Sequence, residues 1–236
     1  ASEPPEAAET VVQPNIVSTL AVCGDAMSHM PQTRDAYDSQ AGAYDYKPMI
    51  RFAKPWIEQA DYAVVNLETT FAGGPDYSGF PAFNTPDALG DALKDAGFDL
   101  VSTANNHCLD RGYDGMVRTL DVLDKLGLAH VGTYRSAEER AAQNGVYVAD
   151  MGGIKVAFLS YTYGTNGIPV SKSHPDTVNI LHTDYMSDTQ VLDTERIADD
   201  LAAAEALSPD LIAVIVHWGV EYQTTQNEHQ EEIADF

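Results

Sequence analysis

Four apolar segments of the sequence each end at polar residues that could bind a metal ion or move a proton. These residues are Asp25, Glu68 with Asn66, Asn106 with His107, and His217. Carboxylate oxygens, amide oxygens and imidazole nitrogens together suit Mn, Fe or Zn better than Ca, which prefers oxygen ligands alone. Such a set is typical of phosphate-ester hydrolysis, in which two metal ions bind phosphoryl oxygens and activate water.

In this chemistry the predicted metal ligands are Asp25, Glu68, Asn106 and His217. His107 is the predicted proton donor to the leaving oxygen. Taken singly, an Asp after a strand is more commonly a turn former, and a His is more commonly a packed or capping side chain. Four such strand ends in one chain favour a shared site, because open α/β folds bind ligands beyond the carboxyl ends of their strands.

Short, β-branched or apolar runs predict the strands that position these residues. Each run directly precedes one of the polar groups, and the last run is the most apolar. The predicted buried strands are 16–22, 62–67, 98–102 and 211–216.

The remaining pattern predicts an α/β fold with one antiparallel hairpin. Gly152-Gly153 separates two strand-like runs, 145–150 and 154–161, as in a β-hairpin. A long loop without periodicity follows at 164–185, and loops of this length are usually functional or mobile. Helical spacing and capping residues predict helices over 46–60, 85–96, 114–126 and 193–207, with the first turns of another over 226–236.

Composition limits the classes of partner. The chain has 236 residues, 13 Lys and Arg, and 36 Asp and Glu, with a net charge of −23, so no nucleic acid partner is expected unless a local basic patch or a metal reverses the field. This charge is more simply explained by solubility on a cell-surface or exported protein than by a functional acidic face.

Residues 1–14 are rich in Glu, Pro and Ala and predict a disordered tether, which leaves residues 15–236 as one domain. Such a tether often follows a removed signal or lipid anchor, so an extracytoplasmic, cell-surface or membrane-tethered location is expected.

Two cysteines and the aromatic residues leave alternatives open. Cys23 and Cys108 both lie in motif segments and could be close in space, although buried thiols are the favoured interpretation. Trp218 and the Tyr-rich stretch could line a site, but packing in the core is favoured.

The motifs resemble those of the bacterial CapA, or poly-γ-glutamate capsule synthesis, family of the calcineurin-like metallophosphoesterase superfamily. The resemblance covers about Val17 to the end. It is carried by Gly24-Asp25, Asn66-Leu67-Glu68, Asn105-Asn106-His107 with Asp110 and Gly112, and His217-Trp218-Gly219 with Glu221 and Gln230.

This resemblance implies a metallophosphatase-like β sandwich flanked by helices, and a part in making or anchoring an anionic cell-surface polymer. The implied partners are that polymer or its precursor and membrane-associated capsule synthesis proteins. The resemblance adds Asp110 to His107 as a catalytic residue. It implies supporting or substrate-contacting roles for Asn66, Asn105, Glu221 and His29.

The sequence also departs from the superfamily pattern. Met27 stands where ordinary members carry a metal-binding His, and whether His29 reaches the site instead is open. Glu68 replaces the bridging Asp. The family continues to a Gly/Ser-His-x-His pair that this sequence does not reach, so we expect a domain incomplete at its C-terminal end and weak metal binding. A metal-dependent phosphoesterase, a non-catalytic scaffold and a polymer-binding component all stay open.

Overall fold

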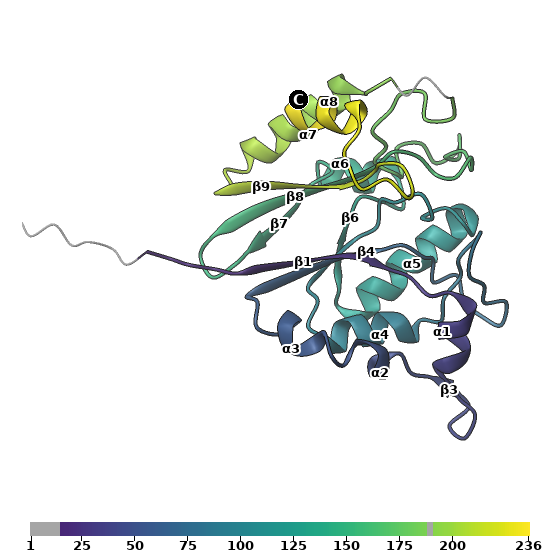
Figure 1. Ribbon diagram of the computed structural model, residues 1–236. Coiled ribbons are helices and arrows are strands. Elements are labelled where there is room, and N and C mark those ends of the chain that lie inside the picture. The colour runs from purple at the N-terminus through teal and green to yellow at the C-terminus, as the bar shows by residue number, and fades with distance from the viewer. Residues whose placement is uncertain (1–14, 188–190) are drawn as a thin grey trace, which may run out of the picture.

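Two β-sheets face each other in the computed structural model, which describes residues 15–187 and 191–236 (Figure 1). The predicted tether, residues 1–14, lies outside the described residues. The first sheet is entirely parallel, with the strand order β1-β4-β5-β6, and the second has the order β7-β8-β9. The strands are β1 (Leu20–Ala26), β4 (Tyr62–Leu67), β5 (Leu100–Ser102), β6 (Ala129–Val131), β7 (Tyr147–Asp150), β8 (Lys155–Thr162) and β9 (Leu211–His217).

The alternating side chains of β4 show how the first sheet is covered on both faces. Ala63, Val65 and Leu67 belong to a core shared with the helices on the outer face of the sheet. Val64 points the other way, into the space between the sheets, and Asn66 continues that face. The helices on the outer face are α2 (Lys47–Ile50), α3 (Lys54–Ile57), α4 (Ala88–Asp95) and α5 (Gly112–Leu126).

The inner faces of the two sheets form a second core. Val64 and Leu100 of the first sheet pack with Val156 and Phe158 of the second. Near the end of this core, the hydroxyl groups of Ser102 and Ser160 lie 2.7 Å apart and form a hydrogen bond between the sheets.

The helices α7 (Thr194–Ala206) and α8 (Glu228–Asp235) cover the outer face of the second sheet, and α6 (Ala137–Ala142) lies near them. Ile197 of α7 and Ile233 of α8 pack with Leu159 and Tyr161 of β8. The predicted α/β class is therefore confirmed: the chain forms a β sandwich flanked by helices. Among the helices of residues 15–187 and 191–236, none is long and apolar enough to cross a membrane.

The predicted hairpin is confirmed, since β7 and β8 pair antiparallel around Gly152 and Gly153. The first strand differs from its prediction, because β1 starts at Leu20 and continues through Asp25. The prediction of one helix over 46–60 was wrong. Pro48 and Pro55 each stand at the start of a separate short helix, where a residue without an N–H is tolerated.

The remaining elements lie between β1 and β4: α1 (Met30–Asp35), β2 (Tyr37–Asp38) and β3 (Ala43–Tyr44). The last strand, β9, is less buried than its apolar sequence predicts. It pairs only with β8 among the described strands, and its Leu211 and Val214 side chains are 53% and 46% exposed.

Candidate metal centre

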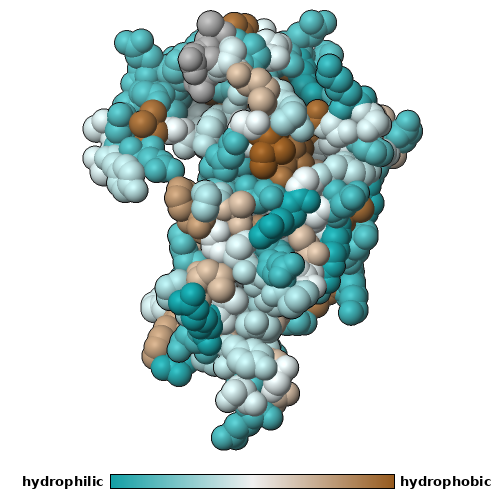
Figure 2. Space-filling model, turned by 90° about the vertical axis from the view of Figure 1, so that its right-hand side faces the viewer, coloured by the Kyte–Doolittle hydropathy of each residue, from teal (hydrophilic) through white to brown (hydrophobic). Residues whose placement is uncertain are grey.

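The carboxyl ends of β1, β4 and β9 meet at one end of the sandwich, on the right in Figure 1, and β5 ends there too because it pairs parallel with β4. Figure 2 looks onto this end, whose surface is mostly hydrophilic and carries small, separate hydrophobic groups. A cavity of about 470 Å³ opens here, which we call the acidic cavity. Its walls include Asp25, Met27, Glu68, Asn106, Tyr163, His217, Trp218, Glu221 and Gln230.

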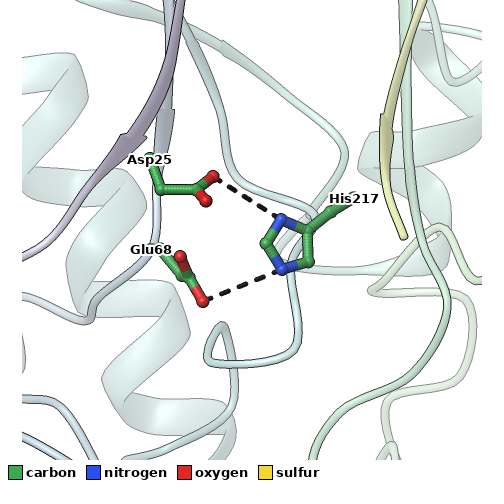
Figure 3. A group of neighbouring side chains, drawn as sticks. All are labelled: Asp25, Glu68 and His217. Atoms are coloured by element: carbon green, nitrogen blue, oxygen red, sulfur yellow. Dashed lines mark ion pairs between the residues drawn. The ribbon is translucent and has the colours of Figure 1, made fainter. Parts of the chain in front are cut away.

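Three of these side chains converge on one point (Figure 3). Asp25, Glu68 and His217 each offer a ligand atom, and the three atoms lie within 4.8 Å of one another. Nδ1 of His217 is 3.6 Å from Oδ1 of Asp25, and Nε2 is 3.7 Å from Oε1 of Glu68. The imidazole ring therefore lies between the two carboxyl groups.

A bulge in β1 places Asp25. The pairing of β1 with β4 shifts register between Cys23 and Asp25, which leaves Gly24 unpaired and sets Asp25 opposite Asn66. The amide of Asn66 donates a hydrogen bond of 2.7 Å to Oδ1 of Asp25. This hydrogen bond holds the Asp25 carboxylate in the wall of the acidic cavity.

Asn105 is fully buried and joins two strand ends. Its amide group donates to the Leu67 carbonyl at 2.7 Å and to Oδ1 of Asn66 at 3.2 Å. Its own oxygen accepts from the backbone N–H of His107 at 3.1 Å. Asn105 thus positions its neighbours and does not reach the open cavity.

Asn106 points to His217. Its Oδ1 lies 3.1 Å from Nε2 of His217, which also faces Glu68. Both neighbours of Nε2 are oxygen atoms, one from the Asn106 amide and one from the Glu68 carboxyl group. The amide oxygen of Asn106 is then on the same side as the carboxylates.

His107 forms a dyad with Asp110. Nδ1 of His107 donates to Oδ2 of Asp110 at 2.6 Å, and the same oxygen accepts from the backbone N–H of Phe83 at 2.6 Å. This contact fixes the ring and its tautomer. Nε2 of His107 then faces the three candidate ligand side chains and lies 3.7 Å from Oε1 of Glu68.

The two carboxyl groups of the cluster differ in their electrostatics. Burial, together with a smaller contribution from the nearby Asp25 charge, raises the pKa of Glu68 to about 7. The hydrogen bond from His217 lowers the pKa of Asp25, whose side chain is 45% exposed. The buried Glu68 carboxyl group lies 3.7 Å from an imidazole nitrogen of both His107 and His217 and close to the Asp25 carboxylate, an environment that suits a bound cation.

The donor set therefore fits a divalent metal ion. Two carboxylates, one imidazole and the Asn106 amide oxygen surround the same space, and this mixture is the kind that first-row transition metals accept. Of the predicted ligands, all four are brought together.

The two predicted supporting residues Glu221 and His29 differ in whether they reach the acidic cavity. Glu221 lines the acidic cavity. His29 precedes α1 and reaches His107 only through Phe83: the His29 ring lies 5.1 Å from the Phe83 ring, which lies 4.7 Å from that of His107. Met27 does line the cavity, at the place where the superfamily pattern has a histidine.

The cysteines are apart in the core. Both thiols are free, and Cys23 and Cys108 belong to different apolar clusters. Burial raises the pKa of the Cys108 thiol to about 12, as expected of a packing residue. Trp218 lies between two cavities, the acidic cavity and an apolar groove along β9 and α8.

Sequence reasoning missed two residues of the long loop after β8. The ring of Tyr163 stacks on the imidazole ring of His217, with 6.2 Å between the two ring centroids. Oδ1 of Asn166 accepts from the Asn106 amide at 3.1 Å, and its Nδ2 lies 3.2 Å from Nδ1 of His107. Asn166 has a φ of 50°, a conformation that Asn tolerates better than most residues. The only sequence signal was the length of the loop.

The chain is similar to two curated capsule proteins of the genus Bacillus. The chain is 26% identical over 224 residues to the capsule biosynthesis protein CapA of Bacillus anthracis, covering 92% of this chain and 50% of that protein. It is 25% identical over 190 residues to the PGA biosynthesis protein CapA of Bacillus subtilis (strain 168), covering 79% of this chain and 46% of that protein. The chain thus spans about half the length of these relatives.

The fold is also found among solved structures. A Staphylococcus aureus protein named as a 5′-nucleotidase, in complex with α-ketoglutarate, superimposes with a TM-score of 0.52 at 16% identity, covering 92% of this chain and 42% of that one. This likeness supports the metallophosphatase type of fold. Residues 19–236 match the family model described as bacterial capsule synthesis protein PGA_cap, and the chain therefore belongs to this family.

Proposed function

We propose that this chain acts in the synthesis or anchoring of an anionic capsule polymer of the poly-γ-glutamate type, through a metal-dependent phosphoesterase or related hydrolase centre. Membership of the capsule synthesis family supports the process. The observation that carries the chemistry is the convergence of Asp25, Glu68 and His217 within 4.8 Å, beside the His107–Asp110 dyad.

The residues divide into metal ligands and a proton donor. Asp25, Glu68, Asn106 and His217 would hold the ion, which we expect to be Mn, Fe or Zn. The bound ion would supply a positive charge that polarises the phosphoryl group and activates water. Without it the acidic cavity would repel an anion, because none of the described residues lining it is Lys or Arg.

His107 would act as the general acid that protonates the leaving group. Asp110 holds Nδ1, so Nε2 is the atom that faces the cluster and can pass a proton to the leaving oxygen. Asn105 and Asn66 support this arrangement through hydrogen bonds alone, since both are buried and bonded to neighbouring site residues.

A non-catalytic scaffold or polymer-binding component is the second candidate. The observation that favours it is Met27 in the wall of the cavity, because a thioether is a poor ligand for a hard divalent ion. In either case we propose an extracytoplasmic site of action, with the polymer or its precursor and membrane-associated synthesis proteins as partners. The net charge of −23 supports a partner other than nucleic acid.

Metal content and turnover of p-nitrophenyl phosphate with added Mn test the enzyme proposal. Asp25→Asn and His217→Asn are expected to lose both bound metal and turnover. His174→Asn is the matched control, because its ring stacks on Tyr113 at 3.8 Å and does not line the acidic cavity. A wild-type protein that binds no metal and has no turnover would favour the scaffold, as would polymer production that survives both site variants.

A further inference from the structure

A second cavity, of about 310 Å³, lies between the long loop after β8 and the start of α7. We call it the basic cavity, because its walls include Lys172, His182 and Arg196 together with Asp176, Tyr185 and Asp193. It is connected to the metal centre through Tyr163. Nδ1 of His182 lies 3.3 Å from the Tyr163 carbonyl oxygen, and the ring of Tyr163 lines the acidic cavity.

The two cavities differ in their charged side chains, since the basic cavity has Lys172 and Arg196 alongside Asp176 and Asp193. The acidic cavity has Asp25, Glu68 and Glu221 in its walls and no cationic side chain among its described residues. Two of the chain's 13 Lys and Arg residues line the basic cavity, although acidic residues outnumber them by 36 to 13 overall. Of these two cavities, only the basic cavity offers Lys and Arg side chains to a negatively charged group of a substrate.

Arg196 is incompletely satisfied by the protein. Its Nε is buried and has no hydrogen-bond partner. Nη1 pairs at 3.1 Å with Asp176, whose side chain is 54% exposed, and Nη2 lies 3.5 Å from Oδ1 of Asn179, which already accepts from Arg140. An exposed ion pair contributes little stability, so a ligand carboxylate can replace Asp176.

The other polar groups of the basic cavity are also suited to an anion. Lys172 is exposed, and none of the described carboxylates lies within 4.0 Å of its ammonium group. His182 is only 5% exposed and donates through Nδ1 to the Tyr163 carbonyl. The Tyr185 hydroxyl accepts from the backbone N–H of Val170 at 2.9 Å, so its own proton can be donated. Asp193 caps α7 by accepting from the backbone N–H of Arg196.

We propose that the basic cavity binds a carboxylate group of an anionic polymer chain while a neighbouring group of that chain lies in the acidic cavity. This inference rests on the proposed function. Arg196 and Lys172 hold the carboxylate, since a guanidinium fork and an ammonium group make strong, charge-assisted hydrogen bonds to carboxylates. The contact of His182 with the Tyr163 backbone joins the two halves of the binding site.

Fluorescence anisotropy with a fluorescein-labelled pentamer of γ-linked glutamate tests the proposal. Measurements are made with added Mn at fixed low salt, because the acidic cavity without a metal ion would repel the neighbouring anionic group. Arg196→Gln and Lys172→Gln are each expected to raise Kd at least tenfold. Arg196→Lys retains the charge without the fork and should fall between. Lys125→Gln is the matched control, because it removes one exposed positive charge from α5 and should leave Kd unchanged.

Each outcome separates this inference from the phosphoesterase proposal. Failure of the wild-type protein to bind the pentamer, or equal Kd values for all folded variants, would overturn the carboxylate site even if p-nitrophenyl phosphate is hydrolysed. Competition by inorganic phosphate but not by glutarate would also overturn it. Loss of pentamer binding in the two variants, with Lys125→Gln unaffected, supports the site even if the protein hydrolyses no phosphate ester.

Discussion

Glu68→Gln is expected to stabilise the metal-free protein at pH 8, although it removes a predicted metal ligand. Burial raises the pKa of Glu68 to about 7 in the folded protein, against 4.5 for an ordinary Glu. Ionisation of this group therefore disfavours folding. The penalty is absent below pH 4.5, grows between pH 4.5 and 7, and is complete above pH 7.

The size of the effect follows from the two pKa values. A difference of about 2.5 pH units, at roughly 1.36 kcal/mol for each unit, corresponds to ~3 kcal/mol in the free energy of unfolding. Gln resembles the protonated carboxyl group in shape and charge, so the variant avoids most of this penalty. We expect a gain of ~2 to 3 kcal/mol at pH 8 and almost none at pH 4.5.

Urea denaturation in EDTA at these two pH values measures the gain, which corresponds to a shift of about 1 M in midpoint for an m-value of ~2 to 3 kcal/mol/M. Asp25→Asn is the control of opposite sign. The pKa of Asp25 is lowered by its contact with His217, so its ionised form stabilises the fold and its loss should lower stability at pH 8. A Glu68→Gln variant no more stable than wild type at pH 8 would refute the assigned electrostatics.

Three other outcomes concern catalysis, metal binding and the core. Asp110→Asn removes the carboxylate that holds the catalytic ring and should lower turnover at least ~100-fold with metal content unchanged; loss of metal would contradict a proton-transfer role. Metal affinity, measured by titration calorimetry, should fall by up to ~tenfold for each pH unit below about 7, because Glu68 must lose one proton to coordinate, and a flat profile would argue against it as a ligand. Asp200→Ala removes the buried carboxylate that pairs with the mostly enclosed Arg140 and should cost ~3 to 5 kcal/mol in thermal or urea unfolding. Asp176→Ala breaks an exposed ion pair and should cost less than ~1 kcal/mol in the free energy of unfolding. Equal losses for Asp176→Ala and Asp200→Ala would contradict the argument that burial makes the second pair more important.

The site residues that follow strands could be predicted because strand ends carry local signals. Apolar runs before Glu68 and His217 show where each chain segment leaves the sheet, and the rule for open α/β folds brings those points together. What the sequence could not show is which residues of a long loop return to the site. Asn166 reaches His107 only because of tertiary contacts that have no local pattern.

The errors in strand prediction have similar physical causes. The bulge at Gly24 extends β1 by several residues beyond its apolar run, since pairing with β4 continues on the far side of the bulge. β9 has the composition of a central strand, but composition does not show how many neighbours a strand has. Helical periodicity over 46–60 was real, yet the two prolines in it divide the segment.

The ligands of the centre come from different sheets, since Asp25 and Glu68 follow strands of the first sheet and His217 ends a strand of the second. An ion bound by all three would act as a cross-link that holds the sheets in alignment. A ligand at 100 times its Kd adds about 2.7 kcal/mol of stability. That increment would oppose only motions that separate or slide the sheets, so amide hydrogen exchange would slow for collective openings while local fraying within either sheet kept its rate.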